Sequence, residues 1–126
     1  MQLSVNGGST YLTSGYIGGA NQMDFSSVSF VANARSTSAF LLSLSPGGES
    51  SNIYNGMAWL FNMTSAVGKV AFRSSHESNG DSIASNLYAG ISAGSYVTGS
   101  ITVNAFKVFP ALGTISGTIS LYGIAQ

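Results

Sequence analysis

Apolar and polar residues alternate along much of this chain, and the alternation is clearest near its C-terminus. Within Thr114–Ile124, the residues Ile115, Ile119 and Leu121 fall on one side of an extended backbone, while hydroxyl-bearing residues fall on the other. A period of two is typical of a half-buried β-strand. No segment long enough for a helix combines helical periodicity with a cap and good helix formers. We therefore expect an all-β chain with no substantial helix.

Several other segments show the same alternation. The expected strands cover residues 3–5, 9–17, 23–31, 38–45, 57–63, 69–73 and 100–108. In strand 100–108, a β-bulge near Ala105 would change the face on which the following side chains lie. Asn6-Gly7-Gly8 would join strands 3–5 and 9–17 in a hairpin. About 7–9 short strands separated by turn residues predict an antiparallel, jelly-roll-like β-sandwich. One domain would span residues 1–126, with 1–22 as an arm or hairpin making contacts between subunits.

Charged residues are rare in this chain. Four Lys or Arg residues balance four Asp or Glu residues, so 6% of the 126 residues are charged and the formal net charge is zero. Soluble domains average about 25% charged residues. A surface of Ser and Thr is easier to bury against a neighbour, because hydroxyls re-form hydrogen bonds across a contact whereas an unpaired buried charge is costly. The composition favours a subunit of an assembly over an enzyme.

The same composition argues against several partners. Four cations balanced by four anions do not make the positive footprint that nucleic acid requires. The chain has no Cys, which excludes thiol chemistry and Cys-based zinc sites. Residues 1–6 lack a signal-peptide pattern, and no apolar run approaches the roughly 20 residues of a membrane helix. We expect no nucleic acid, no membrane and no cofactor.

His76 is the only histidine, so a Ser–His catalytic pair would have to use it. It lies in the polar stretch 74–81, which we interpret as a solvated loop, and no Gly-x-Ser-x-Gly elbow is present. Glu77 and Asp81 offer a glycosidase-type carboxylate pair, but nothing near them indicates the burial that separates two pKa values. Glu77, Asn79 and Asp81 form a weak candidate calcium loop, half of the oxygen ligands such a site needs. We expect no catalytic residue.

The aromatic residues divide into two groups. Trp59 and Phe61 lie at strand spacing among apolar residues and are interpreted as core. Five tyrosines lie nearer to turns, among Ser and Asn, a composition that suits either glycan recognition or a polar contact between subunits. These candidate binding residues are Tyr11, Tyr16, Tyr54, Tyr88 and Tyr96.

The C-terminal run Gly113–Ile124 resembles the closing strand of a broad group of tailed-bacteriophage structural proteins, whose jelly-roll domains often end in a Gly-x-Ile-x-Leu-Tyr-Gly-Ile phrase. The segment from Asn6 to Tyr16 is similar in style to the same group. The resemblance implies a β-sandwich virion protein, commonly trimeric, that decorates capsids as a cement subunit or forms part of a tail fibre or tip. It implies no catalytic motif.

Two functions follow as expectations from the resemblance and the composition. The first is a non-enzymatic capsid decoration protein that stabilises the shell as a homotrimer and contacts the major capsid protein or other virion proteins. The chain shows no shaft or coiled-coil pattern, which favours this role. The alternative is a tail-fibre or tail-tip head domain that recognises bacterial surface glycan. Either protein would be located in the virion, after assembly in the host bacterial cytoplasm.

Overall fold

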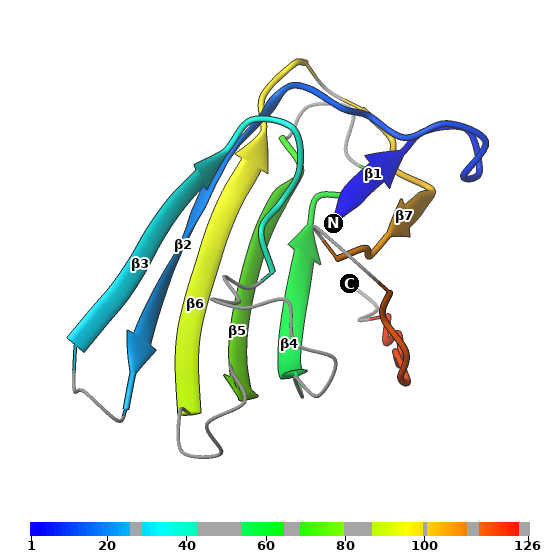
Figure 1. Ribbon diagram of the computed structural model, residues 1–126. Coiled ribbons are helices and arrows are strands. Elements are labelled where there is room, and N and C mark those ends of the chain that lie inside the picture. Colours follow the sequence, from blue (N-terminus) through cyan, green and yellow to red (C-terminus); the bar gives the residue numbers. More distant parts are fainter. Residues whose placement is uncertain are drawn as a thin grey trace.

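The computed structural model describes residues 1–25, 29–42, 54–64, 69–79, 87–99, 101–110 and 114–123. This part of the chain contains seven β-strands and no helix (Figure 1). The strands are β1 (Gln2–Ser4), β2 (Tyr16–Asp24), β3 (Ser29–Ser36), β4 (Tyr54–Phe61), β5 (Ala71–Asn79), β6 (Leu87–Tyr96) and β7 (Ala105–Lys107).

The strands form two antiparallel sheets. One has five strands in the order β3-β2-β6-β5-β4, and the other consists of β1 and β7 (Figure 1). This arrangement is consistent with a β-sandwich and confirms the all-β, antiparallel class expected from the sequence. The first described strand pairs with the last, and the second pairs with the sixth. Sequential hairpins β2–β3 and β4–β5–β6 build the rest of the large sheet.

The core lies where the two sheets meet. Even-numbered residues of β2, β5 and β6 face inward, as Tyr16, Phe72 and Tyr96 illustrate. The Tyr16 ring meets the Phe40 ring edge-on at 4.9 Å and the Tyr96 ring edge-on at 5.3 Å, while Phe40 stacks on Phe72 at 4.9 Å. The buried core cluster consists of Met1, Leu3, Tyr16, Phe40, Val70, Phe72, Tyr96 and Val103.

The N-terminal residues belong to this core and do not form the expected hairpin. Leu3 is fully buried in β1, which pairs with β7 and not with residues 9–17. Residues 11–13 still return toward β1, because the Leu12 amide donates to the Leu3 carbonyl at 2.9 Å. Tyr16 fixes this return, since its hydroxyl accepts from the Leu3 amide at 2.8 Å and donates to the Leu12 carbonyl at 3.1 Å. The expected glycine turn is present, with positive φ at Gly7 and Gly8.

Two predicted strands in the middle of the chain have the wrong boundaries. The expected strand 23–31 contains the end of β2, a turn at Phe25 and the start of β3, because alternation continues on both sides of a turn that has no Gly or Pro. The expected strand 38–45 is not a strand over its described residues, 38–42. The Ser36 hydroxyl accepts from the amides of Ser38 and Ala39, and this local bonding bends the chain after β3.

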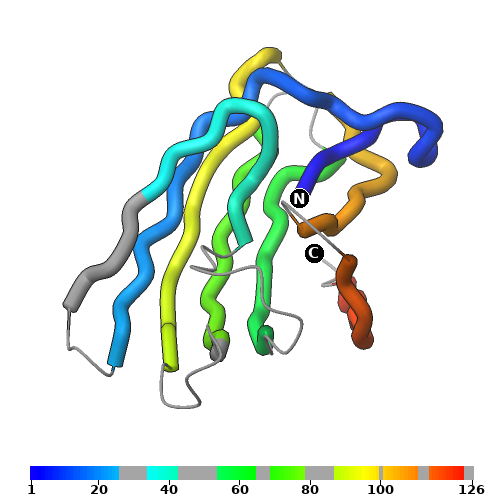
Figure 2. The backbone as a smooth tube through the Cα atoms, in the orientation of Figure 1, coloured from blue at the N-terminus to red at the C-terminus, as the bar shows by residue number. Residues whose placement is uncertain are grey.

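The C-terminal third departs most from the sequence prediction. Over 101–104 the chain is irregular, because Val103 bonds to the Met63 carbonyl and Asn104 to the Ser4 carbonyl, so the strand is shortened to β7 and the predicted bulge does not arise. The segment 114–123, predicted as the clearest strand, pairs with neither sheet. A period-two pattern shows that a segment can pair as a strand, but it does not show which strand, if any, the segment pairs with. The segment lies outside the two sheets, to the right of β4 in Figure 2.

Candidate functional site

A row of polar side chains is buried on the inner face of β5, below the aromatic core. Ser74, His76 and Ser78 continue the inward phase of Phe72, and His76 is 3% exposed. The interpretation of residues 74–81 as a solvated loop is therefore wrong for 74–79, which form most of β5. The sequence does contain a strand signal, because the even-numbered residues from Val70 to Ser78 are all buried. Serine at two of these positions is nevertheless typical of a loop.

Two glycines make room for the His76 ring. The antiparallel register places Gly90 of β6 and Gly56 of β4 directly beside His76. Across Gly90, the His76 Nε2 atom lies 3.3 Å from the Gln22 Oε1 atom of β2. On the other side, the Tyr54 ring stacks on the imidazole with ring centroids 5.8 Å apart. A side chain at either glycine would collide with these rings, so the glycines are what allow the cluster to form.

The rest of the cluster is bonded to one backbone carbonyl. The hydroxyls of Ser74, Ser92 and Tyr54 each donate to the Leu42 oxygen, at 3.3 to 3.5 Å. Within the part of the chain that the structure describes, three buried side-chain atoms have no hydrogen-bond partner, namely Gln22 Nε2, His76 Nδ1 and Ser78 Oγ. Burial lowers the pKa of His76, and the nearby Leu42 carbonyl acts in the opposite direction. A neutral, buried histidine of this kind organises the sheet and is not accessible to a polymeric substrate.

The stability of the fold should decrease as the solution is acidified. Burial and the nearby Lys107 charge lower the pKa of the Met1 amino group from 8.0 to about 6, and burial also lowers that of His76. Both groups bind fewer protons when folded than when unfolded, so stability is complete above about pH 8 and is lost as the pH falls toward 6 and below. We expect the free energy of unfolding to decrease by about 1–2 kcal/mol between about pH 8 and 5.5. Most carboxyl groups titrate below this pH range and do not contribute to the change. Urea unfolding at both pH values measures it.

A His76→Gln variant provides the control for this pH dependence. It should keep the part that belongs to the amino group, which runs from about pH 8 down to about pH 6, and lose only the part that His76 adds below about pH 6.5. A wild-type protein whose stability is unchanged or greater at the lower pH would contradict both assignments.

The carboxylate and metal candidates are not brought together by the described structure. Glu77 lies on the outer face of β5, opposite to His76, and is exposed. Asn79 is the last residue of β5, and Asp81 lies outside the described residues. Within the described ranges, no group of three or more His, Cys, Asp or Glu side chains is arranged to hold a metal ion.

The five tyrosines do not share one surface. Tyr16, Tyr88 and Tyr96 are buried, and Tyr16 and Tyr96 belong to the aromatic core. Tyr54 lies on the edge strand β4, stacked on His76. Tyr11 lies near β7, where the Lys107 ammonium is 4.6 Å from its ring centroid.

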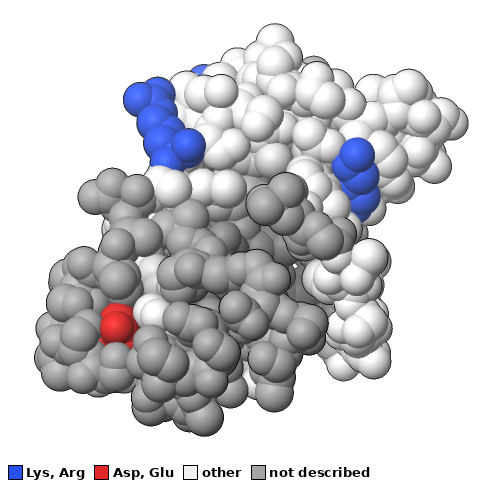
Figure 3. Space-filling view, in the orientation of Figure 1, with Lys and Arg blue, Asp and Glu red and all other residues white. Residues whose placement is uncertain are grey.

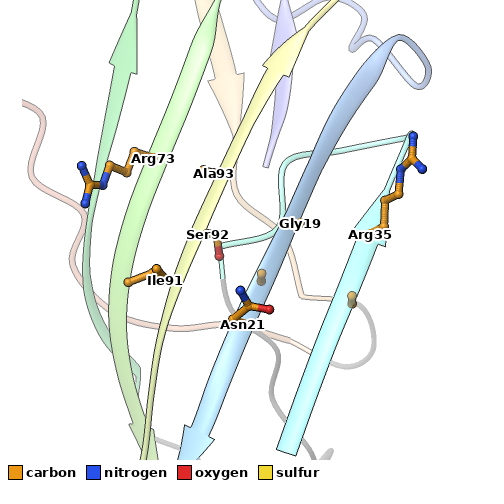
Figure 4. Close-up of a pocket in the computed structure, with 9 residues that line it drawn as sticks. Gly19, Asn21, Arg35, Arg73, Ile91, Ser92 and Ala93 are labelled. Carbon is orange, nitrogen blue, oxygen red and sulfur yellow. The ribbon is translucent and has the colours of Figure 1, made fainter. Parts of the chain in front are cut away.

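The outer face of the large sheet carries a shallow depression of about 590 Å³. The register aligns Arg35 of β3, Gly19 of β2, Ala93 of β6 and Arg73 of β5 in one row. Figure 4 shows the two arginines at opposite sides of the depression, with small residues between them. Three strand spacings of about 4.8 Å separate the two backbones by roughly 14 Å. The sequence did not indicate this site, because the two arginines are far apart in the chain.

The edge strand β4 exposes the apolar residues that we interpreted as core. Met57, Trp59 and Phe61 are 60%, 37% and 48% exposed, so the core interpretation of Trp59 and Phe61 is wrong for a single copy. The period-two pattern correctly predicted that these residues share one face of a strand. It did not reveal that this face is the outer one, which no described element of the same chain covers.

The C-terminal segment 114–123 adds a second exposed apolar group. Ile115, Ile119, Leu121 and Tyr122 are all more than half exposed, and Tyr122 reaches 85%. Around these residues the described surface carries few charges, as Figure 3 shows for one face of the molecule. β4 and segment 114–123 each expose apolar side chains and contain no charged residue, so each is more suited to burial than to solvent.

Comparison of the chain with protein-family models, with curated proteins and with solved structures gave no match. Among the described residues, no helix has the length and apolar character needed to cross a membrane. The function therefore has to be inferred from the surfaces and contacts described above.

Proposed function

We propose that this chain is a non-enzymatic structural subunit of a tailed-bacteriophage virion, a capsid decoration or cement protein that stabilises the assembled shell. The observation that carries the proposal is the exposure of large apolar side chains on two elements without charged residues, β4 and segment 114–123. The similarity of the C-terminal phrase to phage structural proteins supports the virion as the location. Its partners would be further copies of itself, as a homotrimer, and the major capsid protein or other virion proteins.

Attachment of such a subunit should depend weakly on salt. Few charges are available to screen, and many uncharged contacts repeated over a lattice add up to strong attachment. Short Ser and Thr side chains also lose little rotamer freedom when they become ordered. Co-sedimentation with shells at about 0.05 and 0.5 M salt should give binding constants within roughly threefold of one another.

The direct test of the decoration role is depletion and add-back. Shells without this protein should lose heat tolerance and regain it when the purified protein is added. A Met57→Ser variant should restore less than the wild type, because a side chain that is 60% exposed in the single copy would no longer contribute apolar area to a contact. Ser75→Ala, a small change at an exposed position of β5, is the matched control. Equal tolerance of shells with and without the protein would contradict the proposal.

A second candidate function is the recognition of bacterial surface glycan by a tail-fibre or tail-tip head domain. The depression between Arg35 and Arg73 favours it, because guanidinium groups and the Asn21 side chain suit a polar, acid-bearing sugar chain. Copy number separates the two functions, since decoration requires hundreds of copies per particle and a tail component requires far fewer. Loss of glycan binding in Arg73→Ala, with no effect on shell stability, would support the second function.

A further inference from the structure

We propose that segment 114–123 is a strand-forming arm that adds to the β4 edge of a second copy of this chain. The inference goes beyond the proposed function, because it names the surfaces through which copies associate and applies to any assembly that contains them. It starts from two elements that lack a partner among the described residues of one molecule, a strand edge without a neighbouring strand and a strand-patterned segment that belongs to neither sheet.

The first element is the free side of β4. Among the described strands β4 pairs only with β5, so one side of its eight-residue backbone has no strand beside it. Exposed edges are normally protected by charged residues or Pro, but Tyr54–Phe61 contains neither. The opposite edge, β3, carries Arg35, and β1 and β7 have only three residues each. β4 is therefore the edge least protected against the addition of another strand.

The second element is the segment itself. Its ten residues, 114–123, have the alternation of a strand and contain no charged residue. Ile115, Ile119 and Leu121 share one side, and all three are more than half exposed. Leaving three large aliphatic side chains in water is unfavourable, because apolar area is stabilised by removal from solvent. A strand partner would cover them and bond the free backbone groups at the same time.

The two elements match each other. An arm added beside β4 would place its apolar side next to Met57, Trp59 and Phe61, as cross-strand neighbours on the outer face. The lengths agree as well, with ten residues in the arm and eight in the edge. Within one copy the arm is not paired with the β4 of its own chain.

The size of the contact fits a second copy. Each protomer would give one arm to a neighbour and receive another on its own edge, so ten and eight residues, 18 in all, would be buried per protomer. Standard stable interfaces involve roughly 20–30 residues a side, so this contact lies just below the lower end of that range. Because the donating and receiving surfaces differ, the contact runs head to tail and closes into a ring when the rotation allows it.

The chain contains a built-in reporter for this contact. Trp59 is the only tryptophan of the sequence and lies within the receiving edge. We expect the full chain to be oligomeric by sedimentation, with Trp59 emission shifting to the blue as the concentration increases. Ile119→Ser combined with Leu121→Ser should weaken association by at least about 100-fold and leave Trp59 solvent-exposed. The matched control, Thr118→Ser, changes the other side of the arm and should associate like the wild type.

A second measurement decides which copy holds the arm. The chain has no Cys, so Ala58→Cys can be introduced in one preparation and Ser116→Cys, Thr118→Cys or Ser120→Cys in the other. Mixing should give disulfide-linked dimers for at least one pairing, whichever register the arm adopts. The arm lies outside the core, so circular dichroism and urea unfolding should show that each variant is folded.

Three results would overturn the inference. They are a monomeric wild type at all concentrations, association that survives the Ile119 and Leu121 changes, or mixed single-cysteine preparations that give no linked dimer in any of the three pairings. Failure of the protein to bind shells would contradict the decoration role but not the arm exchange, so the two proposals fail separately.

Discussion

Replacing Phe40 by alanine is expected to lower the free energy of unfolding by about 3–5 kcal/mol. The Phe40 ring is almost fully buried and joins two layers of the core, meeting Tyr16 edge-on and stacking on Phe72, each at 4.9 Å. Its backbone also bonds to Met1 in both directions. Removing the ring would leave a cavity between Tyr16 of β2 and Phe72 of β5.

Urea or thermal unfolding measures this effect. A loss of this size is a large part of the roughly 5–15 kcal/mol that stabilises a typical domain, so Phe40→Leu, expected to cost about 1–1.5 kcal/mol, provides a variant that stays folded. Phe109→Ala is the matched control, because that ring is 41% exposed, and it should change stability by about 0.5 kcal/mol or less. Equal effects of Phe40→Ala and Phe109→Ala would show that the core is not where the structure places it.

The second large effect is expected at Gly90. A Cβ atom at this position would lie 2.5 Å from the Asn21 carbonyl oxygen and 2.5 Å from His76 Cε1. The Asn21 oxygen belongs to the backbone of β2 and cannot rotate away, so the sheet itself would have to shift. We expect Gly90→Ala to lower the free energy of unfolding by about 3 kcal/mol and to break the contact between His76 and Gln22.

Gly123→Ala is the control for the Gly90 change. Nothing lies within 4 Å of a Cβ atom at Gly123, and its φ is not positive, so alanine should be tolerated there. Denaturation gives the stability of both variants, and the chemical shifts of the His76 ring protons show whether the imidazole has moved. A Gly90→Ala protein as stable as the wild type would mean that the strands around His76 are less tightly packed than described.

The sequence predicted the start of β5 well, because burial over residues 69–73 follows a simple alternation. Val70 and Phe72 face inward and Lys69 and Arg73 are exposed, as the pattern required. His76 was misplaced for the opposite reason. Serine is common in loops, so the inward parity that continues at Ser74 does not distinguish a strand from a loop. The two glycines that make room for the imidazole lie on other strands, and the local sequence around His76 does not reveal them.

Surface patterns were harder to predict than the core. The alternation in β4 correctly placed Met57, Trp59 and Phe61 on one face, but periodicity does not say which face of a sheet is covered. The same limit applies to segment 114–123, whose pattern is that of a strand although no described strand of its own chain lies beside it. The depression between Arg35 and Arg73 depends on strand order, which a single sequence does not reveal.

Closure of the small sheet also has a kinetic consequence. The β1–β7 pair joins the two ends of the described fold, and the bond from Asn104 Nδ2 to the Val5 carbonyl links residues 99 positions apart. Contacts of such long sequence separation are slow to form, because a large loop must be ordered before the pairing stabilises it. The hairpins β2–β3 and β4–β5–β6 can form first, and docking of residues 2–4 onto 105–107 would then be the late step that seals Leu3 and Tyr16 away from water.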